Sequence, residues 1–259
     1  MIKDMRKTVL RMVAEAGSGH LGASLSAIEI LAILYFLKMR HSPKDPEWAG
    51  RDRFILSKGH AAPALYAVLA EAGYFPREEL FSLRRLGSRL QGHPDTAVPG
   101  VDAMTGSLGQ GLSIAVGMAL AAKMDGAGYK VYILLGDGEL DEGQVWEAAL
   151  SASHHGLDNL IAVVDRNHYQ LSGRTENIKS LEPLGEKWRA FGWEAREADG
   201  HDPGSILDAL ESCDLSDGRP SVVIARTRKG KGVSFMEGNA FSRRVPDSEE
   251  LKRALAELS

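Results

Sequence analysis

The feature that most constrains this chain is a pair of wholly apolar segments, each followed at once by polar residues. The first covers residues 131–135 and leads into Gly-Asp-Gly at 136–138, and the second covers residues 160–164 and leads into Asp-Arg-Asn at 165–167. Continuous apolar runs of this length are typical of parallel strands that are buried on both faces. A helical pattern over residues 143–155 separates them. The stretch therefore predicts two neighbouring parallel strands connected by a helix.

The polar residues at the ends of these strands predict a binding site. Asp137 and Asn167 follow the carboxyl ends of the two strands, where open α/β sheets bind ligands. A carboxylate and an amide oxygen that converge there suit Mg²⁺, which completes its shell with water and substrate phosphates. Gly138 lets a diphosphate approach the backbone at a helix N-terminus. The alternative is two ordinary strand-end turns.

The rest of the chain alternates between helical and strand patterns. We therefore predict an α/β fold with a mainly parallel sheet flanked by helices. Further strands are expected near residues 52–57, 193–197 and 220–225. Helices are expected at 2–16, 26–39, 63–73, 77–86, 112–124 and 205–212, at a segment ending near 192, and from 248 onward. Residues 87–109 are rich in Gly and Pro and predict a long loop, a kind of segment that is usually functional.

No clear linker divides the chain, so we predict one domain over residues 1–259, with a C-terminal tail at about 239–259. The net charge of −4, with both signs interspersed, indicates no nucleic-acid or anionic-membrane partner. One cysteine excludes an intrachain disulfide framework. The apolar run 28–39 contains Glu29 and is too short to span a bilayer, so it predicts a buried helix. Because no secretory signal is expected either, we expect a cytoplasmic location.

Four loops containing glycine complete a recognisable pattern. They are Ser-Gly-His-Leu-Gly at 18–22, Ser-Lys-Gly-His at 57–60, Gln-Gly-His-Pro at 91–94 and Thr-Gly-Ser-Leu-Gly-Gln-Gly at 105–111. Together with Gly-Asp-Gly and the later Asn, they resemble the motifs of transketolases, in the same order. The resemblance runs from about Arg6 to Gly238. It implies the diphosphate-binding domain of the thiamine diphosphate-binding fold, as the separate N-terminal subunit of a two-chain enzyme.

The resemblance implies a role for each matching residue. Asp137 and Asn167 would hold Mg²⁺ through their side chains, Tyr169 would hold it through its backbone carbonyl, and the N–H of Gly138 would bind the diphosphate. Further cofactor-binding residues would be His60 at the diphosphate, Gly106, Ser107 and Leu108 along the cofactor, and Leu171, which with Leu108 would pack on the thiazolium. The catalytic residues would be His20 and His93, facing the donor hydroxyls, and Glu142, in a relay at the subunit interface.

These residue types suit the chemistry that the resemblance implies. A two-carbon ketol unit would pass from a ketose phosphate or related donor to an aldose acceptor, with the ring of thiamine diphosphate as the electron sink. Proton transfer between hydroxyl groups near neutral pH suits imidazole, which is the side chain of His20 and His93.

The chain departs from the family pattern in two places. We expect no pyrimidine-binding domain after Gly238, and in the family that domain carries the glutamate that activates the cofactor. The resemblance therefore implies an α2β2 heterotetramer with a C-terminal transketolase subunit, and a chain that is inactive alone. The family's Trp-His-Gly histidine is also absent from residues 240–246, where only Arg243 or Arg244 could supply a cation. We therefore expect donors other than the usual pentose phosphates.

Two other functions remain open at the level of sequence. The chain could be half of another thiamine diphosphate enzyme, either a 2-oxo acid decarboxylase or dehydrogenase or a deoxyxylulose-phosphate synthase relative, which Ser-Gly-His-Leu-Gly-Ala-Ser-Leu also resembles. It could instead be a non-catalytic assembly subunit. The loops at 57–60 and 91–94 favour transketolase, and the intact metal-binding set argues against a non-catalytic role.

Overall fold

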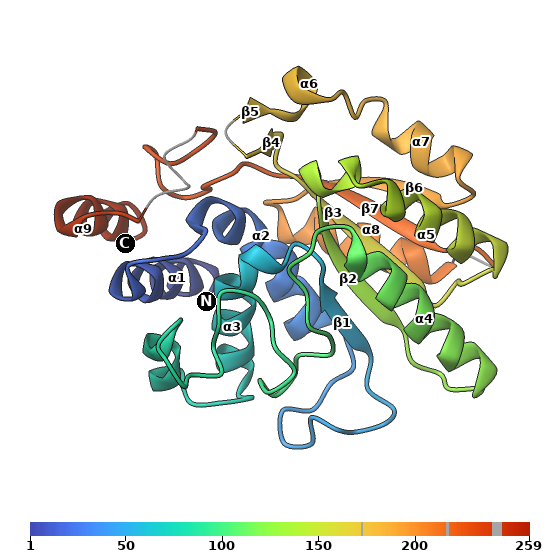
Figure 1. The fold of residues 1–259 in the computed structure, drawn as a ribbon, viewed down its shortest axis with the longest axis horizontal. Helices are drawn as coiled ribbons and strands as arrows, with labels where there is room; N and C mark the ends of the chain where they lie inside the picture. The colour runs from blue at the N-terminus through green and yellow to red at the C-terminus, as the bar shows by residue number, and fades with distance from the viewer. Residues whose placement is uncertain (172, 216–217, 240–244) are drawn as a thin grey trace.

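A five-stranded parallel sheet forms the centre of the molecule, with the strand order β1-β2-β3-β7-β6 (Figure 1). The computed structural model describes all residues except 172, 216–217 and 240–244. In chain order the strands of this sheet are β1 (Arg53–Leu56), β2 (Val131–Gly136), β3 (Leu160–Arg166), β6 (Glu194–Asp199) and β7 (Ser221–Arg226). The two central strands pair from Val131 and Leu160 to Gly136 and Asp165, so their carboxyl ends lie side by side. The predicted α/β fold with a mainly parallel sheet is confirmed.

Helices cover both faces of the sheet and enclose two separate cores. One core contains α1 (Ile2–Ala16), α2 (Leu21–Ile33), α3 (Ala62–Ala72) and α8 (Pro203–Ser212), with α9 (Ser248–Glu257) beside α1. The other contains α4 (Gln110–Met124), α5 (Gly143–His154) and α7 (Leu184–Ala190). Within β2, Tyr132 and Leu134 belong to the first core and Ile133 to the second. This alternation of side chains explains why both central strands are apolar throughout.

Several short elements lie between the main ones. They are η1 (Leu34–Lys38), η2 (Gly59–Ala61), η3 (Arg77–Ser82), η4 (Gly138–Asp141), η5 (Cys213–Leu215), the hairpin strands β4 (Tyr169–Gln170) and β5 (Gly173–Arg174), and α6 (Thr175–Ile178). The hairpin and α6 follow directly after β3, and no hydrophobic periodicity predicted them. They form the part of the chain that continues from the carboxyl end of the central strands (Figure 1).

Two predicted helices have other bounds. The helix expected at 77–86 is wrong beyond Ser82, because Leu83 leaves the helical region and Arg84 adopts a φ of 57°. The helix expected at 26–39 begins earlier, at Leu21. Its polar residues are buried with partners, since Ser24 donates to the carbonyl of His20 and Glu29 accepts from the guanidinium of Arg6.

With η1, the second helix covers Leu21–Lys38. Within the described part of the chain it is the one helix that is long and apolar enough to cross a membrane, so the expectation from its length was wrong. Most of it lies inside the protein, as the prediction of a buried helix required. The long loop expected at 87–109 is confirmed, because no helix or strand occurs between Ser82 and Gln110.

Truncation of a central strand residue should destabilise the isolated chain strongly. Leu134 is fully buried in β2, so we expect Leu134→Ala to lower the free energy of unfolding by about 2–5 kcal/mol. Leu150 on α5 is 56% exposed and provides a matched control, for which Leu150→Ala should stay within about 0.5 kcal/mol. Urea unfolding measures both changes. Equal effects of the two substitutions would contradict the placement of β2 at the centre of the core.

Candidate active site

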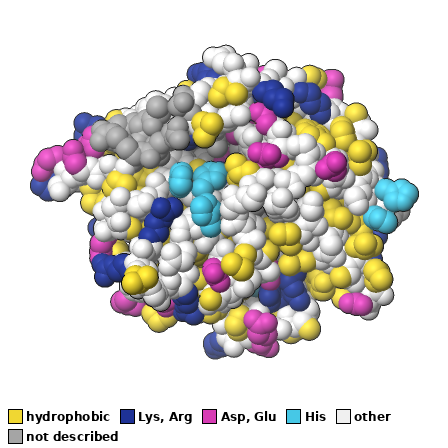
Figure 2. Space-filling model, viewed as in Figure 1, with side chains coloured by type: hydrophobic (Ala, Val, Ile, Leu, Met, Phe, Trp, Pro, Cys, Tyr) yellow, Lys and Arg dark blue, Asp and Glu magenta, His cyan; other side chains and the backbone are white. Residues whose placement is uncertain are grey.

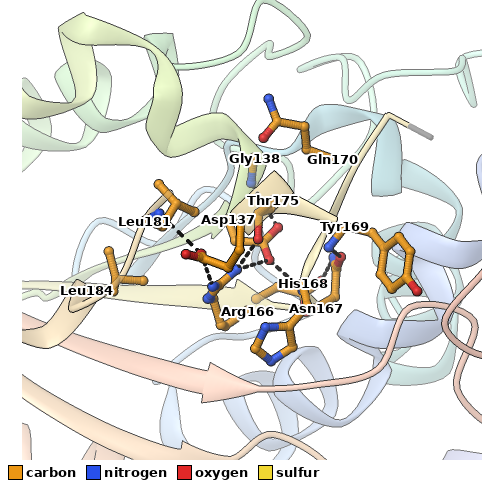
Figure 3. A network of polar contacts seen from close by, with 12 residues as sticks. Asp137, Gly138, Arg166, Asn167, His168, Tyr169, Gln170, Thr175, Leu181 and Leu184 are labelled. Carbon is orange, nitrogen blue, oxygen red and sulfur yellow. Dashed lines mark hydrogen bonds and ion pairs between the residues drawn. The ribbon is translucent and has the colours of Figure 1, made fainter. Parts of the chain in front are cut away.

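Asp137 lies directly after β2 with its side chain buried. Its Oδ1 accepts the N–H of Gly138 at 2.8 Å. Its Oδ2 accepts the N–H of His168 at 2.6 Å and an N–H of Arg166 at 3.1 Å (Figure 3). An ionised carboxylate can accept about four hydrogen bonds. Among the described residues these three contacts leave room for one further partner, on Oδ1.

The charge state of Asp137 indicates what that partner should be. Burial and, after it, the nearby charge of Asp165 raise the pKa of this carboxyl to about 6, although the charge of Arg166 lowers it. A buried carboxylate with a raised pKa is stabilised as an anion by any added positive charge. The environment therefore favours a bound cation beside Asp137.

Asn167 completes the edge of the sheet beside Asp137. Its Oδ1 accepts the N–H of Tyr169 at 3.1 Å, and its Nδ2 donates to Oδ2 of Asp165 at 3.4 Å. These two contacts fix which end of the amide carries the oxygen, and they set the oxygen toward the Tyr169 backbone (Figure 3). Asp165 itself accepts hydrogen bonds from Ser26, Lys58 and Thr227. These contacts use its oxygens, so it stabilises the loop and is not available as a metal ligand.

The donor set fits Mg²⁺. Among the described residues no group of three or more His, Cys, Asp and Glu side chains is arranged to hold a metal. The site instead offers one carboxylate, one amide oxygen and the backbone of Tyr169, which leaves coordination positions for water and diphosphate oxygens. These residues would hold the ion, and thiamine diphosphate would bind to it through its phosphates.

Gly138 allows the backbone to approach closely at this point. A Cβ built at Gly138 would lie 2.5 Å from Cβ of Gln170 in β4, so no other residue fits without movement. Its N–H donates to Asp137 in this structure. To bind a diphosphate as predicted, this N–H must either donate to Asp137 and the diphosphate together or leave Asp137 for the diphosphate.

Three of the predicted histidines lie together. The rings of His20 and His60 are in edge contact, with centroids 5.3 Å apart, and His93 is near enough to influence the pKa of His60. Figure 2 shows histidine side chains gathered in the middle of this face of the molecule. Burial, followed by the charge of Lys58, lowers the pKa of His60 to about 3. Burial, followed by Arg84, also lowers the pKa of His93.

The loop from Thr105 to Gly109 lies between His93 and the end of β1, since the hydroxyl of Thr105 donates to the carbonyl of Leu56. Gly106 has a φ of 156°, and a Cβ there would lie 3.3 Å from the ring of His93. An open pocket of about 770 Å³ is lined by His93, Arg84, Gly106 and Ser107, among others. The structure therefore brings His93, Gly106 and Ser107 to one hollow.

The remaining predicted residues lie nearby, at exposed or partly exposed positions. Leu108 is partly buried, and its carbonyl accepts from Gln144 at 3.4 Å. Leu171 is 71% exposed with a φ of 49°, an unusual conformation for a branched side chain. Glu142 is exposed before the first turn of α5. Their roles toward the thiazolium and at a subunit interface remain predictions.

Two important groups were missed by the sequence analysis. The buried carboxylate of Glu139 accepts from Ser57 and from the N–H groups of Gly109 and Gly136, so it links β1, the 105–109 loop and β2. Arg166 is fully buried beside Asp137. A charged residue next to a turn motif gives no sequence signal that it will be buried. The predicted replacement of the family histidine at 240–246, with Arg243 and Arg244, falls largely on 240–244, outside the described residues.

Comparison with known proteins places the chain in one family. A family model described as "Transketolase, thiamine diphosphate binding domain" matches residues 1–252. The chain is 50% identical over 256 residues to the 6-deoxy-6-sulfo-D-fructose transketolase subunit SqwG of Clostridium sp. (strain MSTE9), covering 98% of this chain and 93% of the relative. It is 46% identical over 255 residues to an apulose-4-phosphate transketolase subunit from Phocaeicola vulgatus, covering 98% and 91%.

The fold also matches solved transketolases. The structure of transketolase from Campylobacter jejuni superposes with a TM-score of 0.93 at 36% identity, covering 99% of this chain and 42% of that one. The chain thus spans less than half of that transketolase but nearly the whole length of the relatives that are named as subunits.

The low pKa of His60 predicts how the chain responds to acid. An unfolded histidine has a pKa of about 6.5, whereas folded His60 titrates at about 3. Between these values the unfolded chain takes up a proton that the folded chain does not, so His60 makes stability fall as pH falls through this window. We expect the His60 ring to remain neutral in NMR spectra between about pH 8 and about pH 5. The NMR signal that disappears in His60→Gln belongs to the His60 ring, and this variant should lose less stability than the unaltered chain as the pH falls. A His60 signal that titrates near pH 6.5 would contradict the burial of this ring.

Proposed function

We propose that this chain, which belongs to the transketolase family, is the N-terminal subunit of a two-component transketolase. The enzyme transfers a two-carbon ketol unit from a ketose donor to an aldose acceptor, with thiamine diphosphate and Mg²⁺ as cofactors. The observation that carries the proposal is that Asp137 and Asn167 directly follow the neighbouring carboxyl ends of β2 and β3, with Asp137 bonded to the N–H of His168. Oδ1 of each side chain accepts one backbone N–H and keeps a lone pair with which it could bind the cation.

Different residues of the chain bind the cation, the diphosphate and the donor. Asp137, Asn167 and the Tyr169 carbonyl bind the cation, and the N–H of Gly138 binds the diphosphate. The cofactor, when bound, supplies the electron sink for cleavage of the bond next to the donor carbonyl. His20 and His93 hold the donor hydroxyls and move protons at their oxygens; both residues are exposed, and His93 lines the hollow. His60, neutral at pH 7 because of burial, donates or accepts a hydrogen bond without adding charge.

The partner is a C-terminal transketolase subunit in an α2β2 assembly. The relatives named as subunits support this, since the chain covers more than nine tenths of each of them. The exposed positions of Glu142 and Leu171 also support it, because both groups would be covered only when a second subunit closes the site. That subunit would supply the pyrimidine-binding domain and the glutamate that activates the cofactor.

The donor is a modified ketose that carries an anionic group. Two relatives with 46–50% identity are named for 6-deoxy-6-sulfo-D-fructose and apulose 4-phosphate, neither of which is an ordinary pentose phosphate. The missing family histidine at 240–246 agrees with a changed donor. Loss of one charge-assisted contact typically costs about 1.5–3 kcal/mol, or roughly 10- to 150-fold in affinity.

Turnover should therefore require the partner and should favour modified donors. We expect no ketol transfer by the purified chain, and transfer once the partner subunit is added. For the complex, kcat/KM for 6-deoxy-6-sulfofructose or apulose 4-phosphate should exceed that for xylulose 5-phosphate at least about tenfold. Robust turnover by the chain alone would show that the site is completed within it. A preference for xylulose 5-phosphate would refute the proposed donor class.

Asp137→Ala should remove Mg²⁺-dependent binding of thiamine diphosphate by the complex. We expect cofactor affinity to fall by more than about 100-fold, since loss of neighbouring groups that merely orient a ligand already costs about 10–100-fold. Calorimetric titration of the cofactor at fixed Mg²⁺ measures the change. Asp125→Ala, at an exposed position after α4, is the control and should bind normally. Equal affinity in the Asp137 and Asp125 variants would exclude Asp137 as a metal ligand.

A further inference from the structure

Arg166 occupies a position where a charged side chain is unexpected. It is the last residue of β3, next to Asn167, and its side chain is 1% exposed. Arginine has five N–H donors in a fixed planar arrangement. All five have partners here, and the contacts are Nε to Glu182, Nη1 to Asp137 and Thr175, and Nη2 to Glu176 and Glu182. A fully bonded, buried guanidinium is held in one place.

The partners of Arg166 lie on two sides of the proposed metal site. On one side is Asp137, whose Oδ2 accepts from Arg166 while Oδ1 accepts only from Gly138 among the described residues. Together with the N–H groups of His168 and Gly138, this contact restrains the orientation of the carboxylate. Oδ1 is then the oxygen with fewer partners, and it could bind a cation; Figure 3 shows the contacts around Asp137 and Arg166.

On the other side, Arg166 holds the segment that follows the hairpin. It donates to Thr175 at 2.6 Å and to Glu176 at 2.7 Å, both in α6, and to Glu182 before α7. The N–H of Thr175 in turn donates to the carbonyl of His168 at 3.1 Å. Because His168 lies between Asn167 and Tyr169, the same guanidinium restrains the backbone that carries the other two proposed ligands.

We propose that Arg166 is a positioning residue that sets the Asp137 carboxylate and the Asn167–Tyr169 backbone in the mutual geometry that the diphosphate-bound cation requires. This inference rests on the proposed function, because it takes a cation and a diphosphate as the occupants of the site. Arg166 does not touch the cation. It acts through the side chain of Asp137 and through Thr175.

Charge alone gives a different expectation. A positive side chain near a bound cation repels it, so a purely electrostatic Arg166 would be replaced without loss by lysine, which has the same charge. Lysine offers three donors from a single atom and cannot span Asp137, Thr175 and the two glutamates at once. Thr175→Val provides a second variant with no change of charge, since it removes one hydroxyl acceptor at a fully buried position.

The chain also contains a matched control. Arg226 pairs with Arg166 in the register between β7 and β3, but its side chain is 48% exposed and pairs with Glu197. Arg226→Lys makes the same chemical change one strand away, outside the proposed site. It should leave the cation requirement unchanged.

The test uses the complex of this chain with its partner. Mg²⁺ is titrated into each variant at a fixed concentration of thiamine diphosphate, and calorimetry gives the half-saturating Mg²⁺ concentration. We expect this concentration to rise about 10–100-fold in Arg166→Lys, because groups that orient metal ligands typically have effects of this size. A rise of several-fold is expected in Thr175→Val, and none in Arg226→Lys. Thermal unfolding without Mg²⁺ and cofactor reports stability separately.

Each outcome decides between the possible roles. An unchanged Mg²⁺ requirement in Arg166→Lys and Thr175→Val, with normal binding by the unaltered complex, would overturn the positioning role. A lower unfolding temperature with an unchanged requirement would assign Arg166 to stability alone. If Arg166→Lys does not fold, Thr175→Val decides the question. Absence of Mg²⁺-dependent binding in the unaltered complex would instead refute the proposed function itself, and the inference with it.

Discussion

The buried carboxylate of Asp165 is the contact on which the rest of the site depends. It accepts hydrogen bonds from Ser26 of α2, from Lys58 after β1, from Thr227 after β7 and from Asn167. Four segments that are distant in the chain therefore meet at one atom group. Removal of one partner of a buried ion pair typically costs about 3–5 kcal/mol, because the other charge is left uncompensated. Loss of Lys58 or Asp165 would thus weaken the contacts among all the loops that carry the site, and not only the hydrogen bond that is removed.

Two buried aspartates on the same edge of the sheet have opposite properties. Burial acts against ionisation in both, yet the Lys58 ammonium and its neighbours lower the pKa of Asp165, whereas the pKa of Asp137 is raised to about 6. The difference lies in their partners. Asp165 has a cation of its own, while Asp137 shares Arg166 with Glu176 and Glu182 and is repelled by Asp165. Asp165 is neutralised by a cation of the protein, whereas Asp137 is the carboxylate that we propose binds the external cation.

Burial also sets the charge state of the histidines beside the site. Burial lowers the pKa of His60 and of His93, so neither ring carries much positive charge at neutral pH. These two rings therefore add little positive charge at the proposed diphosphate site. Neutral rings remain able to accept and return protons at substrate hydroxyls, which is the task that the proposed reaction gives to His93.

Local patterns in the sequence were sufficient for the central strands, the helix between them, the polar residues at their ends and the ordered loops that identify the family. Each of these depends on residues close together in the chain, whose periodicity reports burial directly. Only the tertiary structure decided that α2 begins at Leu21, that Glu139 and Arg166 are buried, and which segments hold Asp165. Those outcomes depend on partners such as Ser26 and Lys58, which lie 139 and 107 residues from Asp165. The burial of a charge is decided by the partner that meets it, and periodicity along one segment contains no information about a partner from another.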